Sequence, residues 1–251
     1  MRKEYLIAGN WKMYKNVEQS REFILALARS FEPRAGMTVA VFPPFIALAG
    51  LRGLDSKIKI GAQNLFQEEQ GAFTGEISPW MLQGLVDYVL IGHSERREIF
   101  KETDETINAK LRAALRFDLL PVLCVGETLQ ERESGKTMAK IQGQLQAALQ
   151  GVEKNDLQRI VVAYEPIWAI GTGRNASPAQ AQEVHQFIGA RLREMAPGQN
   201  LPILYGGSVK PENSLELLAQ PDISGVLVGG ASLKVDTFSA IIQHCTQLLT
   251  K

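Results

Sequence analysis

The sequence predicts an α/β fold in which eight parallel strands alternate with helices. Short apolar runs recur along the whole chain, and each is continuous rather than alternating, which is typical of parallel strands buried on both faces. Segments with helical periodicity separate these runs, at roughly 30 residues per strand–helix unit. The predicted strands cover residues 5–9, 37–42, 58–62, 88–92, 121–126, 160–164, 203–207 and 226–229.

Local signals predict the helices between these strands. Ser177 suits an N-cap, Pro178 the first helical position and Gln180 the third, so a helix is predicted to start at Pro178. Apolar residues follow in this helix at spacings of three and four, at Ala181, Val184, Ile188, Leu192 and Met195. The last helix repeats the pattern at Phe238, Ile241, Ile242, Cys245, Leu248 and Leu249.

This alternation implies a parallel sheet with right-handed crossovers, which either closes into a barrel or spreads into an open doubly wound sheet. The 251 residues contain no Pro/Gly/Ser-rich linker, so we expect one domain over residues 1–251. One connection, from residue 63 to about residue 78, is far longer than the usual loop between a strand and a helix. Long loops of this kind tend to be functional.

Charge and cysteine content exclude several classes of protein. Lys plus Arg equals Asp plus Glu, 27 against 27, so there is no electrostatic footprint for nucleic acid or an anionic membrane. Two cysteines, Cys124 and Cys245, cannot form a disulfide framework. The first apolar run ends at Gly9, too early for a signal peptide, and no stretch reaches the length of a membrane span. We therefore expect a cytoplasmic protein that binds neither nucleic acid nor membrane.

Residues that can carry chemistry follow five of the predicted strands. In a parallel α/β protein the active site lies at the carboxyl ends of the strands. These residues are Asn10 and Lys12 after the first strand, His93 after the fourth, Glu165 after the sixth, Ser208 behind Gly206-Gly207 after the seventh, and Gly229-Gly230 after the eighth. Together they offer a base, a proton-donating electrophile, a cation and backbone N–H groups for an anion.

Taken singly, each of these residues also has an ordinary structural interpretation. A lone histidine after a strand is more often a residue with satisfied hydrogen bonds than a catalyst. Glu165 alone could cap a helix or join a core ion pair, and Lys12 alone could be a solvated charge. His185 and His244 fall on predicted helices among polar neighbours, and we expect no catalytic role for either.

Five longer segments surround these residues and carry more information than any single position. They are Ala8-Gly9-Asn10-Trp11-Lys12, Ile91-Gly92-His93-Ser94-Glu95-Arg96-Arg97, Ala163-Tyr164-Glu165-Pro166-Ile167-Trp168-Ala169-Ile170-Gly171-Thr172-Gly173, Tyr205-Gly206-Gly207-Ser208-Val209 and Gly229-Gly230-Ala231-Ser232-Leu233. In sequence and in order they resemble the triosephosphate isomerase family. The resemblance implies a closed, single-domain (β/α)8 barrel of the TIM type rather than an open sheet.

The resemblance also implies a reaction and the residues that perform it. Members of the family are isomerases of glycolysis and gluconeogenesis, and interconvert dihydroxyacetone phosphate and D-glyceraldehyde 3-phosphate through an enediolate, with no metal and no organic cofactor. The implied catalytic residues are Glu165 as the base, His93 as the electrophile, Lys12 as the cation, Asn10 as a hydrogen-bond donor, and Glu95. Substrate and phosphate are expected to bind at Asn10, Lys12, Gly171, Ser208, Gly229 and Gly230.

His93 is expected to act as a neutral imidazole. Residues 94–97 are predicted to begin a helical turn, whose free N–H groups would face one ring nitrogen of His93. An N–H donated to that nitrogen leaves the other nitrogen as the donor toward the substrate.

The family also implies a lid over the site and a homodimer. The lid residues are Pro166, Ile167, Trp168, Ala169, Ile170, Gly171, Thr172, Gly173, Arg174, Asn175 and Ala176. The sequence departs from the family at Arg174-Asn175, where members more often carry lysine followed by a small residue or threonine. The tip of the long loop, Phe73, Thr74, Gly75 and Glu76, would insert into the partner, where Thr74 would support Lys12 and His93.

Two other functions fit parts of this inventory. A class I aldolase would use a lysine that forms a Schiff base, but Lys12 follows an Asn-Trp pair rather than lying inside a strand. A barrel that had lost catalysis and served as a binding protein should lack one of Asn10, Lys12, His93 or Glu165, and this sequence keeps all four.

Overall fold

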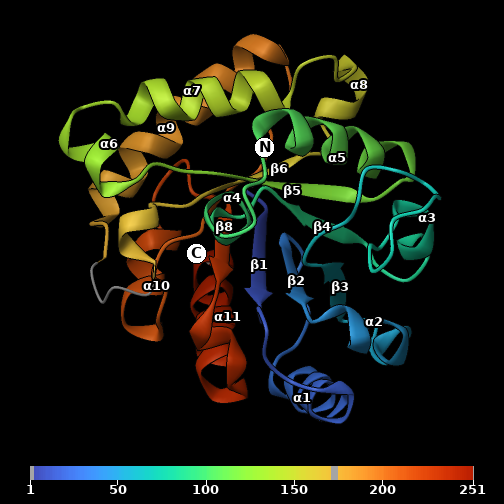
Figure 1. Ribbon diagram of the computed structural model, residues 1–251. Coiled ribbons are helices and arrows are strands. Elements are labelled where there is room, and N and C mark those ends of the chain that lie inside the picture. Colours follow the sequence, from blue (N-terminus) through green and yellow to red (C-terminus); the bar gives the residue numbers. More distant parts are fainter. Residues whose placement is uncertain (1–2, 171–174, 251) are drawn as a thin grey trace.

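The strands form a closed, all-parallel barrel in a computed structural model that describes residues 3–170 and 175–250. Each strand pairs with the next along the chain, and β1 pairs with β8 to close the barrel (Figure 1). The strands are β1 (Tyr5–Asn10), β2 (Met37–Phe42), β3 (Ile58–Ala62), β4 (Tyr88–Ile91), β5 (Leu120–Val125), β6 (Val161–Tyr164), β7 (Ile203–Tyr205) and β8 (Gly225–Val228). The predicted (β/α)8 barrel is therefore confirmed.

The strand ends differ from the predicted ends by at most two residues. The largest difference is at β7, which ends at Tyr205 because Gly206-Gly207 already belong to the turn. β4 ends before Gly92, whose φ of 71° lies in the left-handed region that favours glycine. After β4 and β7 the glycines thus belong to the turn and not to the strand.

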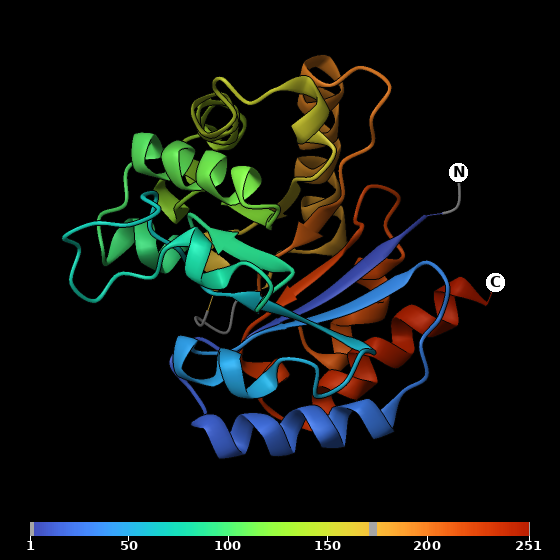
Figure 2. The same cartoon turned by 90° about the vertical axis from the view of Figure 1, so that its right-hand side faces the viewer.

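Helices pack around the outside of the barrel (Figure 2). They are α1 (Val17–Ser30), α2 (Phe45–Leu51), α3 (Pro79–Leu82), α4 (Ser94–Glu98), α5 (Asp104–Arg116), α6 (Leu129–Glu133), α7 (Thr137–Ala148), α8 (Lys154–Leu157), α9 (Pro178–Met195), α10 (Pro211–Leu218) and α11 (Val235–Leu249), with 3₁₀ turns η1 (Ile167–Ala169) and η2 (Gly230–Leu233). As predicted, α9 begins at Pro178 with a capping box between Ser177 and Gln180.

Two apolar layers hold the barrel together. Small and branched side chains from alternate strand positions fill its interior, among them Ala8, Ala40 and Leu227. Phe42 also points inward, and a Cβ at Gly61 of β3 would lie 2.3 Å from the Phe42 ring, so glycine at position 61 makes room for that ring. The outward-facing strand residues pack against the apolar stripes of the helices.

The long connection after β3 protrudes from the barrel at the right-hand edge of Figure 1. The Phe66 and Phe73 rings lie 4.6 Å apart, and the Phe66 N–H donates to the Ile77 carbonyl, so the loop is closed by its own contacts. Its tip, from Phe73 to Glu76, is exposed.

Cys124 and Cys245 are both buried and free. Among the described residues, no helix has the length and apolarity needed to cross a membrane.

Candidate active site

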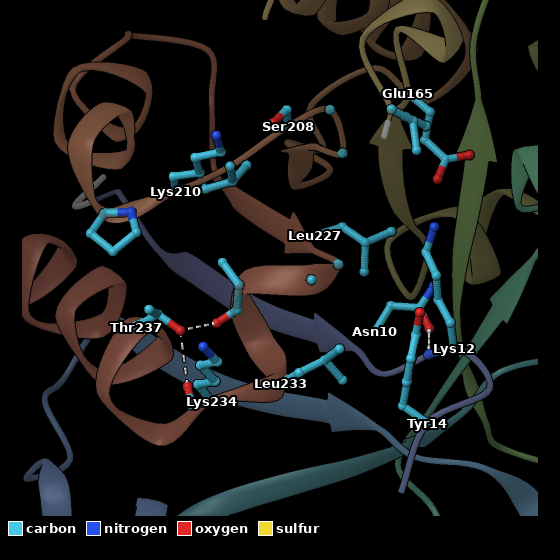
Figure 3. Close-up of a pocket in the computed structure, with 18 of the residues that line it drawn as sticks. Asn10, Lys12, Tyr14, Glu165, Ser208, Lys210, Leu227, Leu233, Lys234 and Thr237 are labelled. Atoms are coloured by element: carbon cyan, nitrogen blue, oxygen red, sulfur yellow. Dashed lines mark hydrogen bonds between the residues drawn. The ribbon is translucent and has the colours of Figure 1, made fainter. Parts of the chain in front are cut away.

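The carboxyl ends of the strands line one cavity of about 600 Å³. Seven of the predicted site residues line this cavity together with Ile170, namely Asn10, Lys12, His93, Glu165, Ser208, Gly229 and Gly230. Figure 3 shows Glu165, Asn10 and Lys12 along one side of this cavity, and Ser208, Lys210 and Lys234 along the other. Glu95 lines a neighbouring cavity of about 200 Å³, which Lys12 and His93 also line. Gly171 lies outside the described residues.

Glu165 is held at the amino end of α4. It follows β6 directly and is 2% exposed. Its Oε2 accepts the Ser94 N–H at 2.9 Å, and its Oε1 lies 3.0 Å from His93 Nε2. The first backbone N–H groups of a helix have no partner within the helix, so they suit a carboxylate. The carboxylate that follows β6 and the imidazole that follows β4 are thus adjacent.

The orientation of the His93 ring is fixed by the turn that follows it. His93 is the N-cap of α4, and the Glu95 N–H donates to its Nδ1 at 3.2 Å. Acceptance at Nδ1 requires a lone pair there, which puts the ring hydrogen on Nε2, the nitrogen nearer Glu165. The predicted N–H donor onto the ring is therefore present.

Arg97 anchors the peptide that carries His93, and sequence reasoning gave it no role. Its Nε donates to the Gly92 carbonyl at 2.8 Å and its Nη2 to the Cys124 carbonyl at 3.1 Å, while Nη1 pairs with Asp104 at 2.6 Å. One guanidinium thus connects β4, β5 and α5 next to His93.

Lys12 has a strained backbone that its neighbours stabilise. Its φ of 51° is left-handed, which costs a non-glycine residue roughly 1–2 kcal/mol. Its N–H donates to Asn10 Oδ1 at 3.0 Å, and its carbonyl accepts Gln63 Nε2 at 2.8 Å. The side chain pairs with Glu95, with Nζ 2.5 Å from Oε1. Gln63 was not predicted as part of the site, and its only signal in the sequence is its position directly after β3.

The glycines of the site allow close approach of neighbouring groups. A Cβ at Gly206 would lie 3.0 Å from Glu165 Cγ, and one at Gly207 would lie 2.9 Å from Pro166 Cγ. A Cβ at Gly229 would meet Lys12 Cε at 3.6 Å, whereas one at Gly230, which opens η2, would meet nothing within 4 Å. Gly229 and Gly230 therefore leave backbone exposed to the cavity next to the Lys12 side chain.

Glu127 is a buried carboxylate that sequence reasoning missed. It is 0% exposed, and its Oε1 accepts both the Tyr164 hydroxyl at 3.0 Å and Trp168 Nε1 at 2.9 Å. Burial raises the pKa of Glu127, against the opposite effect of these two hydrogen bonds. Its carbonyl also accepts the Ile167 N–H, so Glu127 holds the start of the segment predicted as a lid.

The structure describes only the two ends of that segment. Pro166 and Ile170 flank the turn η1, and Asn175 and Ala176 precede the Ser177 cap of α9. Gly171, Thr172, Gly173 and Arg174 lie outside the described residues.

His185 differs from its predicted surroundings. It is 0% exposed and packs against the rings of Tyr164 and Tyr205, so the expectation of polar neighbours was wrong. The reason is its position on α9 one residue after Val184, on the helix face that packs on the barrel. His244 is partly buried, and its Nδ1 lies 2.8 Å from the Ser214 hydroxyl.

Comparison with known proteins identifies the family. The sequence model of the family described as triosephosphate isomerase matches residues 5–245. The chain belongs to the triosephosphate isomerase family. The triosephosphate isomerase of Carboxydothermus hydrogenoformans is 53% identical, over 97% of this chain and 99% of the relative. Those of Moorella thermoacetica and Roseiflexus sp. (strain RS-1) are 51% identical, over 95% and 94% of this chain and 98% and 96% of the relatives.

Membership of the triosephosphate isomerase family agrees with the barrel and with the cavity at its carboxyl end. Within residues 3–170 and 175–250, no group of three or more His, Cys, Asp or Glu side chains is arranged to hold a metal ion. The described site offers a carboxylate, an imidazole, an amide and an ammonium group, on Glu165, His93, Asn10 and Lys12.

Proposed function

We propose that this chain isomerises triose phosphates, interconverting dihydroxyacetone phosphate and D-glyceraldehyde 3-phosphate. One observation carries the proposal: Glu165 and His93, 3.0 Å apart, share a cavity with Asn10 and Lys12. The reaction moves a proton between adjacent carbons and a hydrogen between adjacent oxygens. It therefore needs a base at the carbons and a hydrogen-bond donor at the oxygens, and the cavity supplies both.

Glu165 is the proposed base. Both of its oxygens contact the start of α4, so the carboxylate must turn from Ser94 and His93 toward the cavity before it takes a proton. It would remove the proton from C1 of dihydroxyacetone phosphate and return it to C2 of the enediolate. Burial at 2% exposure keeps water from competing for the carboxylate.

His93, Asn10 and Lys12 are proposed to stabilise the enediolate. The Nε2–H of the neutral His93 would donate to the substrate carbonyl oxygen and then move the hydrogen between the two oxygens. Asn10 would hydrogen-bond the same end of the substrate, and the Lys12 ammonium would offset the developing negative charge. Glu95 fixes the Lys12 side chain through its ion pair.

The substrate phosphate is proposed to bind opposite Glu165. Ser208, Gly229 and Gly230 line that part of the cavity, and backbone N–H groups at the start of η2 suit an anion. We propose that residues 166–176 cover the bound substrate, with the Gly171 N–H on the phosphate and Ile170 over the reacting carbons.

A homodimer is also proposed. The cavity shared by Lys12, His93 and Glu95 is bordered by two exposed apolar side chains, Met13 at 95% exposure and Phe100 at 62%. Exposed apolar side chains beside a cavity are typical of a protein–protein interface. The tip of the long loop, with Thr74, is the part of a partner proposed to fill it.

Sedimentation across nanomolar to micromolar concentrations tests the dimer. We expect activity to fall as the dimer dissociates, since the partner supports Lys12 and His93. A fully active monomer would contradict the proposal.

We further propose that the enzyme works in the cytoplasm and binds neither nucleic acid nor membrane, in line with its balanced charge and its free, buried cysteines.

A coupled assay with D-glyceraldehyde 3-phosphate tests the function. We expect formation of dihydroxyacetone phosphate by the purified chain and loss of turnover in Glu165→Gln. Borohydride would trap a covalent adduct with the ketone substrate if the chain were a class I aldolase, and we expect no adduct. Binding of the substrate without any turnover would instead indicate a non-catalytic binding protein.

A further inference from the structure

Three aromatic side chains form a buried cluster behind the proposed base. Tyr164, Tyr205 and His185, which we call the aromatic cluster, are each 0% exposed. The His185 ring lies 5.6 Å from Tyr164 at an interplanar angle of 85° and 6.2 Å from Tyr205 at 36°. The two tyrosine rings lie 6.4 Å apart. Each ring therefore contacts both of the others.

The two tyrosines reach opposite ends of segment 166–176. The Tyr164 hydroxyl donates to Glu127 Oε1, which also accepts Trp168 Nε1 at 2.9 Å. The Tyr205 hydroxyl lies next to the Ala176 backbone but has no hydrogen-bond partner among the described residues; burial raises the pKa of Tyr205 to about 12, and the neighbouring Ala176 backbone opposes this increase. The aromatic cluster thus connects the start of the segment at Trp168 with its end at Ala176.

The same tyrosines precede residues of the active site. Tyr164 is followed by Glu165, and Tyr205 is followed by Gly206. The Gly206 N–H donates to the Tyr164 carbonyl at 2.7 Å, so the ends of β6 and β7 are also joined through the backbone. A shift of Tyr164 would therefore move Glu165, the proposed base, and a shift of Tyr205 would move Gly206, which packs on Glu165.

His185 is the member of the cluster that comes from a helix rather than from the barrel. Its Nδ1 lies 2.7 Å from the Ala181 carbonyl one turn earlier in α9, and because a carbonyl only accepts, Nδ1 carries the hydrogen. Burial lowers the pKa of His185 to about 4, against its backbone hydrogen bonds, so the ring is neutral at pH 7. The hydrogen bond fixes the plane of the ring, which an apolar side chain of α9 could not do.

We propose that His185 is a positioning residue for the isomerisation. Its tethered ring holds Tyr164 and Tyr205 where their hydroxyls reach Glu127 and Ala176, and so fixes both ends of segment 166–176 relative to Glu165. This inference rests on the proposed function, because it assigns His185 a role in that reaction without contact to the substrate.

Two variants separate the ring of His185 from its tether. His185→Phe keeps an aromatic ring but loses the hydrogen bond to Ala181, and His185→Gln keeps a hydrogen-bond donor but loses the ring. His244→Gln is the matched control, since His244 is a histidine on α11 that contacts Ser214 and lies outside the cluster. The measurements are kcat and KM at 25 °C, the thermal midpoint, and the ¹⁹F spectrum of protein labelled with 5-fluorotryptophan. The protein has three tryptophans, and the ¹⁹F resonance of Trp168 is assigned as the one that is absent from the spectrum of Trp168→Phe.

We expect both His185 variants to lower kcat by about 10-fold, as for a misplacement near 0.5 Å, with KM changed much less. The Trp168 resonance should shift in both, while His244→Gln should match the unsubstituted protein in kcat and in the Trp168 resonance. A role in stability alone would lower the thermal midpoint and leave kcat and the Trp168 resonance unchanged at 25 °C. That result would overturn the inference.

If the His185 variants do not fold, Tyr164→Phe and Tyr205→Phe carry the test, since both keep the ring and remove only the hydroxyl. Each should lower kcat, and Tyr164→Phe should shift the Trp168 resonance; an unchanged kcat and resonance in both would also overturn the inference. The ¹⁹F measurement needs no turnover. An inactive unsubstituted protein would therefore refute the proposed function while the effect of His185 on Trp168 could still be read.

Discussion

Gly206→Ala is expected to impair catalysis by moving Glu165 without unfolding the barrel. The added Cβ would lie 3.0 Å from Glu165 Cγ and 3.2 Å from the Tyr164 carbonyl oxygen. Ordinary carbon contacts begin near 3.4 Å, and the carbonyl belongs to β6, so the Glu165 side chain must yield by about 0.5 Å. A misplacement of about 1 Å can cost on the order of 100-fold in rate, and half of that corresponds to about 10-fold. The φ of Gly206 is not in the left-handed region, so alanine adds no backbone strain.

Steady-state kinetics with D-glyceraldehyde 3-phosphate measure this effect. We expect kcat to fall about 10-fold with KM within about 3-fold, because the perturbation acts on the base rather than on the phosphate contacts. Gly143→Ala is the matched control: it lies in α7, its Cβ would meet nothing within 4 Å, and alanine should stabilise the helix by up to about 1 kcal/mol. A Gly206→Ala variant with the kcat of the control would refute the argument that glycine at position 206 is required for the placement of Glu165.

Three further outcomes are expected. Glu165→Asp withdraws the carboxylate by one methylene, and kcat should fall on the order of 100-fold while a phosphate-containing inhibitor still binds; normal turnover with weaker binding would mean that the base lies elsewhere. Burial lowers the pKa of His185 from its ordinary value of 6.5 to about 4 in the fold, so the unfolded state takes up the proton first as the pH falls. The contribution of the neutral ring to stability is therefore lost between pH 6.5 and 4. In urea titrations His185→Phe should lose about 3 kcal/mol less stability than the unsubstituted protein from pH 7 to 4, and equal losses would contradict this. Deletion of residues 170–173 should leave a folded barrel with low kcat that releases methylglyoxal and inorganic phosphate, because an exposed enediolate phosphate can expel its phosphate; slow turnover without methylglyoxal would argue against the lid.

The sequence predicted the strands well because a strand buried on both faces is a local pattern. The apolar runs at 37–42 and 58–62 match β2 and β3 residue for residue. Closure of the barrel was different, since it depends on the pairing of Leu6–Gly9 with residues 225–228, more than 200 positions away. Periodicity along the chain carries no information on that pairing, and only the family resemblance distinguished a barrel from an open sheet.

The site was predictable where a residue acts through its own chemistry directly after a strand. Glu165, His93 and Lys12 are of this kind. Gln63 and Glu127 were missed because each acts through a partner that is distant in sequence, the Lys12 carbonyl for Gln63 and Trp168 for Glu127. His185 was misjudged because its polar neighbours along the helix point away from the face that packs on Tyr164 and Tyr205. Side chains that position others become recognisable only when the fold brings the elements together.

Isomerisation of dihydroxyacetone phosphate in D₂O tests most directly whether Glu165 transfers a proton through an enediolate. The proton that Glu165 removes can exchange with solvent before it is returned, so ¹H NMR should show deuterium at C2 of the D-glyceraldehyde 3-phosphate formed. Glu165→Gln should form neither the product nor the label. Product formed at the normal rate without deuterium would indicate a direct hydride shift, and labelled product from Glu165→Gln would indicate another base; either result would contradict the mechanism.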